Sequence, residues 1–309
     1  MSNNKHLSDF VATILLGEPN TETNGVLLSL SVTKVRRPQL SRVSPSMETD
    51  YPAMQPKCER VDMDLPDYTD VLQQTEEILR QCFQQYKLEE VFLSFNGGKD
   101  CTVLLDITLN ILKDMHKAND VAKNIKVVYI RTKGPFREIE DFVNIVQKHY
   151  GIRLIVTEGE MRTTLQNILD EDSRLKAVLM GTRRTDPYSH TLEYMQKTDS
   201  NWPQIIRVSP LLDWSYHQIW NYILQRNVPY CSLYDRGYTS IGSVMNTWPN
   251  PSLAYTDECG YKSYLPAWQL KDPAEERAGR GTHPPNIIAN GHHSNSHHSN
   301  GHHSNVIVE

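Results

Sequence analysis

The sequence has 309 residues, a length that predicts about two domains, and its 39% hydrophobic and 8% aromatic residues are enough for a packed core. It carries 32 lysines and arginines against 37 aspartates and glutamates, a formal net charge of -5. That balance argues against a nucleic-acid-coating protein, although a local basic site can still hold phosphates. No apolar stretch approaches the about 20 residues that span a bilayer, and the five cysteines form no CxxC pair. We therefore expect no membrane protein, no disulfide scaffold and no structural zinc.

Both ends of the chain differ in composition from its middle. Residues 1–65 are rich in Ser, Thr, Asn and Pro, which predicts a flexible arm with one short strand at 26–32. Residues 282–309 hold the repeats GHHSN, SHHSN and GHHSN, which predict a disordered tail; low complexity without function is favoured over metal binding. The first 30 residues contain one lysine and no arginine, a poor targeting signal, so we expect a cytoplasmic protein.

The middle of the chain alternates between helical and strand patterns. Apolar residues at helical spacing predict helices over 71–86, 100–115, 139–150, 161–169 and 214–225. Gly151 terminates the third of these helices, and Asp213 caps the last. Uncharged apolar runs predict strands at 91–95, 127–130, 154–156, 177–180 and 205–208. This order predicts a three-layer α/β fold, with a mostly parallel central sheet and helices on both faces.

Ligands of such sheets bind beyond the carboxyl ends of the strands, so the loops there carry the candidate site. The loop after the first predicted strand reads SFNGGKDC, residues 94–101. Two glycines let the backbone approach a ligand closely, and the N-terminus of the following helix attracts an anion. The sequence therefore predicts a phosphate site built from Ser94, Asn96, Gly97, Gly98 and Lys99.

Asp100 is unexpected in a phosphate site, because a carboxylate repels phosphate unless a cation lies between them. It either caps the helix or holds Mg²⁺ between phosphates. A strand–turn–helix connection without a ligand is the alternative interpretation of the whole loop. The spacing excludes a Walker A motif, which requires GxxxxGK[ST].

The loop after the fourth predicted strand reads GTRRTDPY, residues 181–188. Arg183 can bind a phosphate or stack on a planar ring. Asp186 can accept an N–H from a heterocycle. A surface ion pair is the alternative for these charges.

These two loops carry a family resemblance. SFNGGKDC resembles the SGGxDS pyrophosphate loop of the adenine-nucleotide α-hydrolase superfamily. With GTRRTDP it resembles the eukaryotic FAD synthases, which are FMN adenylyltransferases related to the sulfonucleotide reductases. The segments WP, PLLDW, LYDRGYTSIG and YLPAW with ERAGR follow in the family's order. The resemblance covers residues 67–281 and implies one catalytic domain over 66–281, with a C-terminal extension of the fold.

The resemblance implies that AMP passes from ATP to FMN with Mg²⁺ present, giving FAD and pyrophosphate without a covalent enzyme intermediate. The catalytic residues would be Asn96, Lys99, Asp100 and Arg280, and Asp100 would bind the metal directly or through water.

The resemblance also implies the binding residues. Phosphate and ATP contacts would come from Ser94, Asn96, Gly97, Gly98, Lys99, the Ile130 backbone beside adenine, Arg277 and Arg280. FMN contacts would come from Gly181, Arg183, Arg184, Thr185, Asp186 and Trp202. Arg277 and Arg280 can face one anion if a helix carries both. Client apo-flavoproteins would be partners, but nucleic acid and membrane would not.

Three other functions remain open. Glu258, Cys259 and Gly260 resemble the ECG motif of sulfonucleotide reductases, but the motif's histidine is missing and no CxxC pair exists for a cluster. A non-catalytic flavin- or ATP-binding module would lose some site residues, whereas all of them are present. A tRNA-thiolating pyrophosphatase would need a basic RNA face and paired catalytic cysteines, and neither is evident.

Overall fold

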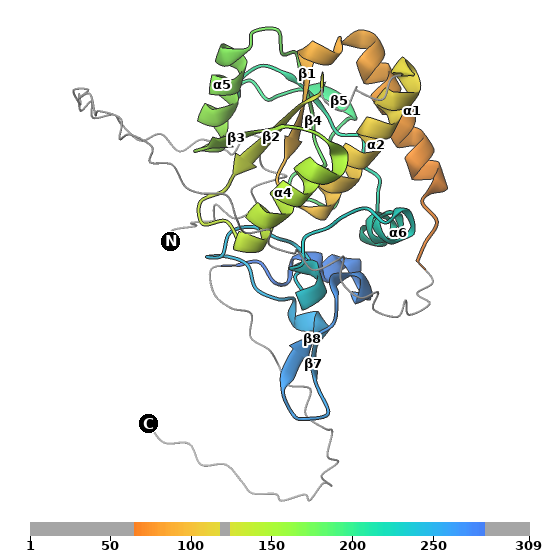
Figure 1. The fold of residues 1–309 in the computed structure, drawn as a ribbon, viewed down its shortest axis with the longest axis vertical. Coiled ribbons are helices and arrows are strands. Elements are labelled where there is room, and N and C mark those ends of the chain that lie inside the picture. Colours follow the sequence, from red (N-terminus) through yellow and green to blue (C-terminus); the bar gives the residue numbers. More distant parts are fainter. Residues whose placement is uncertain (1–64, 118–123, 282–309) are drawn as a thin grey trace, which may run out of the picture. The chain divides into compact units, whose positions relative to one another are not determined.

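A computed structural model describes residues 65–117 and 124–281. These residues fall into two compact units, 65–232 and 233–281 (Figure 1). The strand predicted at 26–32 and the histidine-rich repeats lie outside the described residues. Within the described ranges, no helix combines the length and apolar character needed to cross a bilayer.

The unit of residues 65–232 is built on a six-stranded sheet with the order β3-β2-β1-β4-β6-β5. Every neighbouring pair is parallel except β5 and β6, which are antiparallel. This confirms the predicted mostly parallel sheet. The strands are β1 (Val91–Phe95), β2 (Lys126–Arg131), β3 (Leu154–Glu158), β4 (Ala177–Leu179), β5 (Met195–Lys197) and β6 (Ile206–Val208).

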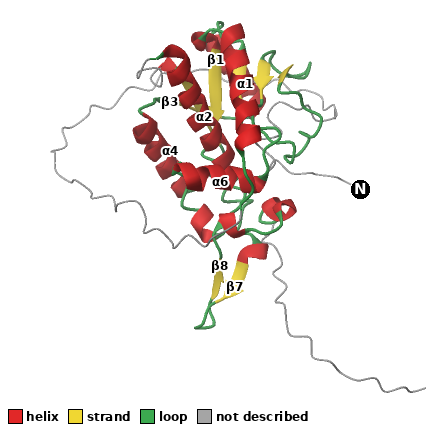
Figure 2. Cartoon of the chain, turned by 90° about the vertical axis from the view of Figure 1, so that its right-hand side faces the viewer, coloured by secondary structure: helices red, strands yellow, loops and turns green. Residues whose placement is uncertain are grey.

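Helices cover both faces of the sheet, as the alternating sequence pattern predicted (Figures 1 and 2). They are α1 (Thr69–Gln85), α2 (Lys99–His116), α4 (Arg137–Tyr150), α5 (Met161–Glu171) and α6 (Tyr216–Arg226). Helix α5 packs on the face that carries Phe92, Val128 and Val178. On the opposite face, α2 packs on β1 and is flanked by α1 and α6. The Tyr129 hydroxyl donates to Glu140 of α4 at 2.6 Å, which places α4 on that face too.

The two edge strands of the sheet differ most from what the sequence pattern predicted. Strand β3 is an edge strand, and its Ile155 and Val156 side chains are 44% and 48% exposed despite the apolar sequence. The other edge, β5, was not predicted from the sequence. It has three residues, none of them buried, and pairing with β6 rather than an apolar pattern defines it.

The start of helix α6 corrects one prediction. Asp213 was expected to cap a helix beginning at Trp214, but α6 begins at Tyr216 with Ser215 as its cap. The Ser215 hydroxyl accepts from the N–H of Gln218 at 3.2 Å, and the Gln218 side chain accepts from the N–H of Ser215 at 2.9 Å. The Asp213 carboxylate instead accepts from Arg184 and Tyr194, so it is unavailable as a cap.

Removing this cap should destabilise the domain. Ser215→Ala deletes the acceptor for the Gln218 N–H, and we expect it to lower the free energy of unfolding by about 1 kcal/mol. Urea unfolding followed by circular dichroism measures the change. Ser173→Ala, in an exposed loop, is the matched control and should stay within about 0.5 kcal/mol of the parent. Equal effects of the two substitutions would contradict the assignment of Ser215 as the cap.

The unit of residues 233–281 contains short elements that the sequence pattern did not predict. A hairpin is formed by β7 (Ala254–Thr256) and β8 (Lys262–Tyr264). The 3₁₀ helices are Tyr234–Arg236, Pro251–Leu253, Ala267–Gln269 and Pro273–Arg277. The fully buried Asn250 ties these pieces together, because its amide donates to the Thr239 hydroxyl at 2.8 Å and to the Glu275 carbonyl at 2.7 Å.

Candidate functional site

The strand order places the two charged loops next to each other. From β1 the chain proceeds outward through β2 to β3, then crosses to β4 on the other side of β1. The carboxyl ends of β1 and β4 are therefore the switch point, where open α/β sheets bind their ligands. Residues 96–98 leave the end of β1 and residues 180–194 leave the end of β4, and they include the charged segments identified from the sequence.

The loop after β1 turns tightly into helix α2. Gly97 has a φ of +76°, and a Cβ there would lie 3.0 Å from Ile139. The N–H of Gly98 donates to the Asn96 side chain at 2.9 Å. Helix α2 begins at Lys99, one residue earlier than predicted, and no side chain caps it. Its first backbone N–H groups therefore lack an intrahelical acceptor and form a site suited to an anion.

Asp100 lies between two buried cations. Its Oδ2 atom is 3.0 Å from the Lys99 Nζ atom, and its Oδ1 atom is 2.7 Å from the Arg183 Nε atom. The side chains of Lys99 and Arg183 are 3% and 1% exposed, whereas that of Asp100 is 21% exposed. Lys99 and Arg183 thus bring two buried positive charges to the start of α2, which suits a ligand with several negative charges. Asp100 is thus an ion-pair partner and does not cap α2.

The loop after β4 packs so closely against the start of α2 that residue 181 has no room for a side chain. A Cβ on Gly181 would lie 2.9 Å from the Cys101 backbone nitrogen and 3.0 Å from the Asp100 carbonyl carbon. The N–H of Arg183 donates to the Asp186 carboxylate at 2.9 Å, which closes the loop on itself. Thr185 is exposed and Asp186 half-buried, so both lie where a ligand can reach them.

Arg184 braces the same loop from outside. Its guanidinium pairs with Asp213 and donates to the Leu192 carbonyl at 2.6 Å. It also lies over the ring of Tyr194, with 5.7 Å from Cζ to the ring centroid. The hydrogen bond to Asp213 raises the pKa of the guanidinium further above its usual value. The Arg184 side chain therefore has a structural role in this state.

Three further predicted contacts are partly or fully buried. Ile130, at the carboxyl end of β2, belongs to the cluster that α5 covers, so only its backbone can face a ligand. Trp202 is half-buried and packs against the same cluster. Ser94 is half-buried on β1, opposite Val128.

Cys101 is a packing residue rather than a nucleophile. Burial, followed by the charge of Asp100, raises the pKa of its thiol to about 12. The thiol therefore stays protonated near neutral pH and cannot attack a substrate as a thiolate.

Arg277 and Arg280 belong to the other unit, and the structure does not place them on one helix. The 3₁₀ helix Pro273–Arg277 ends at Arg277. Arg280 instead pairs through its backbone with Thr247, and its Nη1 atom donates to the Ser240 hydroxyl at 3.1 Å. The Arg280 N–H donates to the Arg277 carbonyl at 2.9 Å, so a turn rather than a continuous helix joins the two arginines. Their role at phosphates stays a prediction.

The ECG segment forms the turn of the β7–β8 hairpin. The Asp257 carboxylate accepts from the N–H groups of Cys259 at 3.0 Å and Tyr261 at 2.7 Å. Cys259 is exposed. Turn formation accounts for Asp257 and Gly260 without any catalytic role.

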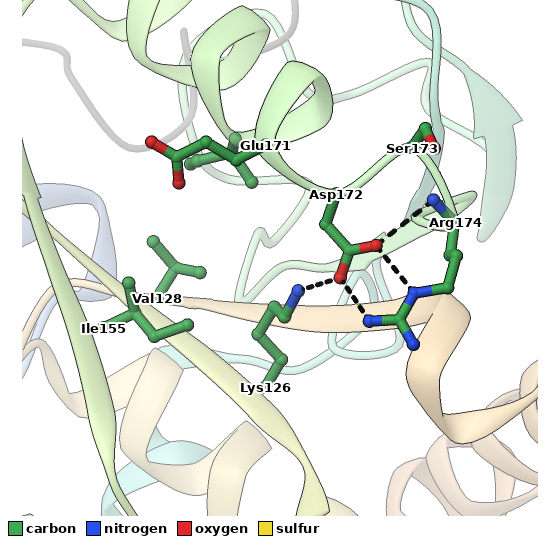
Figure 3. Close-up of a pocket in the computed structure, with 8 residues that line it drawn as sticks. Lys126, Val128, Ile155, Glu171, Asp172, Ser173 and Arg174 are labelled. Carbon is green, nitrogen blue, oxygen red and sulfur yellow. Dashed lines mark hydrogen bonds and ion pairs between the residues drawn. The ribbon is translucent and has the colours of Figure 1, made fainter.

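A cavity of about 450 Å³ lies away from this site, between α5 and strands β2 and β3 (Figure 3). Its polar side is an ion triad in which Asp172 accepts from both Arg174 and Lys126. These bonds hold the pKa of Asp172 far below its usual value, so its carboxylate is charged and engaged by both cations. The cavity is at the amino end of β2, remote from the switch point. Its lining residues are Lys126, Val128, Ile155, Ile168, Glu171, Asp172, Ser173 and Arg174.

The sequence matches the family described as the phosphoadenosine phosphosulfate reductase domain over residues 90–172 and 161–249. It is 41% identical over 209 residues to a probable FAD synthase of Schizosaccharomyces pombe, covering 67% of this chain and 77% of that protein. A probable FAD synthase of Caenorhabditis briggsae is 36% identical, but the match spans 72% of this chain and only 42% of that protein. The structure resembles Candida glabrata FMN adenylyltransferase in complex with FAD and inorganic pyrophosphate. That match has a TM-score of 0.63 and 29% identity, covering 68% of this chain and 86% of the other.

Proposed function

The chain belongs to the eukaryotic FAD synthase family, and on that premise we propose how it transfers AMP from ATP to the phosphate of FMN, giving FAD and pyrophosphate. The observation that carries this proposal is the cluster of Lys99, Asp100 and Arg183 beside the uncapped start of α2. It combines two buried cations with the N-terminus of a helix at the switch point of the sheet. Both features suit a chain of phosphates.

The reaction needs alignment and charge rather than an enzyme nucleophile. The FMN phosphate is already anionic and attacks the α-phosphorus of ATP in line, so the obstacle is repulsion between phosphates. The backbone of residues 96–99 and the Lys99 ammonium hold the β- and γ-phosphates and stabilise the departing pyrophosphate. Arg280 and Arg277 are predicted to add to this charge. The protonated Cys101 takes no part.

The residues present fit a magnesium ion that is held mainly by substrate. In the described residues there is no cluster of three or more His, Cys, Asp or Glu side chains. Mg²⁺ commonly binds through one or two carboxylates plus substrate phosphates and waters. Asp100 supplies such a carboxylate, directly or through water, but shares it with Lys99 and Arg183. When bound, the metal would neutralise phosphate charge.

The loop 181–186 forms the flavin side of the site. Thr185 is exposed and Asp186 half-buried on this loop, and a carboxylate such as that of Asp186 can accept an N–H of the isoalloxazine. Arg183 belongs to this loop yet pairs with Asp100, so it ties the flavin loop to the phosphate loop. Arg184 supports the loop from outside. The predicted contacts also include the half-buried Trp202 and the Gly181 backbone.

Three wider aspects follow from the family. We expect residues 66–281 to act as one catalytic domain, because the family features extend across them. A cytoplasmic location stays a prediction. Client apo-flavoproteins are the macromolecular partners that an FAD-producing enzyme would serve.

Incubating the protein with FMN, ATP and Mg²⁺ should produce FAD and pyrophosphate in equal amounts, measured by chromatography and a pyrophosphate assay. Replacing ATP with its α,β-methylene analogue should stop both products, because the bond that must break is absent. A binding module would retain FMN without releasing pyrophosphate. A reductase would instead release sulfite from adenosine phosphosulfate and a thiol. Either of these results without FAD would overturn the proposal.

A further inference from the structure

Lys99 carries a charge into the protein interior and needs to be held there. Its side chain is 3% exposed. Asp100 pairs with it at 3.0 Å, but that carboxylate is shared with Arg183. On another side, the Lys99 Nζ atom lies over the face of the Tyr216 ring, 5.2 Å from its centroid. A cation within about 6 Å of an aromatic face is attracted to it, most strongly where water is excluded.

Tyr216 is a fixed surface for this contact. It is 1% exposed and is the first residue of α6, directly after the Ser215 cap. The rings of His217 and Trp220 stand edge-on to it, with centroids at 5.6 Å and 6.4 Å. Helix α6 packs beside α2 (Figures 1 and 2). The Tyr216 ring thus contacts the phosphate loop from a separate helix, α6, and the Ser215 cap holds the start of that helix.

We propose that Tyr216 is a positioning residue, whose ring face holds the Lys99 ammonium at the start of α2 in the orientation that binds ATP phosphates. This inference rests on the proposed function of Lys99. Tyr216 acts through Lys99 and is assigned no contact with substrate. The aromatic face rather than the hydroxyl carries the effect, so phenylalanine serves in its place.

Kinetics of FAD formation separate the ring from the hydroxyl. A buried cation–π contact is worth about 2 kcal/mol, which corresponds to about 30-fold. We expect Tyr216→Leu to lower kcat/KM for ATP by about 10- to 30-fold and to leave KM for FMN within about twofold. Tyr216→Phe should stay within about threefold of the parent. Ile219→Ala, in the buried face of the same helix, is the control for lost stability and should leave kcat/KM for ATP unchanged below its unfolding temperature.

A double-mutant cycle excludes a merely structural role. In a Lys99→Met background, Tyr216→Leu should lower kcat/KM for ATP by less than about twofold further, because the ammonium that the ring holds is gone. The proposal would be overturned if Tyr216→Leu lowered kcat/KM for ATP by the same factor in the Lys99→Met background as in the parent. It would also be overturned if Tyr216→Phe lowered kcat/KM for ATP as much as Tyr216→Leu. Calorimetric titration with ATP repeats the same cycle without turnover. If the parent protein binds ATP but makes no FAD, the proposed function fails, while the titrations still decide the role of Tyr216.

Discussion

Replacing Asp100 with asparagine should lower kcat for FAD formation by about 10²- to 10³-fold, the range seen when one group that stabilises the transition state is removed. Asparagine keeps the size of the side chain and one acceptor oxygen for Arg183 or Lys99. It removes the charge that positions both cations and that would hold Mg²⁺. Steady-state kinetics at saturating FMN and ATP measure the effect.

The ion pairs predict a different result for alanine. Asp100→Ala leaves the buried ammonium of Lys99 and the buried guanidinium of Arg183 without this carboxylate. Removing one partner of a buried pair costs about 3–5 kcal/mol. Asparagine should cost less, about 1–3 kcal/mol, because its carbonyl still accepts. Urea unfolding should therefore rank the parent above asparagine and asparagine above alanine, while both variants lose kcat to a similar extent.

Kinetic controls decide whether Asp100 acts in the chemistry or only in the fold. Raising Mg²⁺ should restore part of the rate in Asp100→Asn if the carboxylate helps to hold the metal. Asp114→Asn, on the exposed end of the same helix, should leave kcat unchanged. An Asp100→Asn enzyme with near-normal kcat would remove Asp100 from the active site, whatever its stability.

Local sequence patterns were sufficient to predict the strands and loops that form the site. The run VFLSF became β1 with the predicted bounds, and Gly151 ends α4 in the left-handed conformation that its position predicted. Both charged loops follow strands, so the rule for parallel sheets indicated their importance without any coordinates. The sequence could not show that β1 and β4 are neighbours, because that adjacency depends on the crossover from β3.

Local sequence patterns could not predict which side chains pair with each other in the site. The sequence assigned Asp100 to a metal and Arg183 to the flavin, yet the two form an ion pair across the neighbouring strand ends. Tyr216 received no role, because nothing near it in the sequence relates it to Lys99. The spacing of Arg277 and Arg280 showed only that a helix would let both face one anion. It could not show that the Gly279 carbonyl between them accepts from the Trp248 N–H at 2.9 Å.

Adding one methyl group at Gly181 should impair the enzyme without changing any charge. The Cβ of alanine would lie 2.9 Å from the Cys101 nitrogen, and backbone atoms cannot rotate aside as a side chain can. The loop after β4 must then move away from α2, which displaces Arg183 from Asp100. We expect Gly181→Ala to lower kcat/KM by about 10²-fold and the free energy of unfolding by about 1–3 kcal/mol.

Gly151→Ala is the matched control for Gly181→Ala. No atom lies within 4 Å of a Cβ at that position, but its φ of +65° penalises alanine, by about 1–2 kcal/mol. It should therefore lower stability to a comparable extent and leave kcat/KM unchanged. A Gly181→Ala enzyme that loses stability but retains full kcat/KM would show that contact between the two loops is dispensable for catalysis.

Combining the substitutions at Gly181 and Asp100 tests whether both act on the same ion pair. Asp100→Asn removes the charge while the loops stay together, whereas Gly181→Ala separates the loops while the charge remains. If the function of the contact is to hold Arg183 against Asp100, the double variant should be little slower than Asp100→Asn alone, because effects of groups that act as a unit do not add. If the double variant lost kcat/KM by the product of the two single losses, Gly181 would position other groups of the flavin loop. Thr185 and Asp186 would be the first of these to examine.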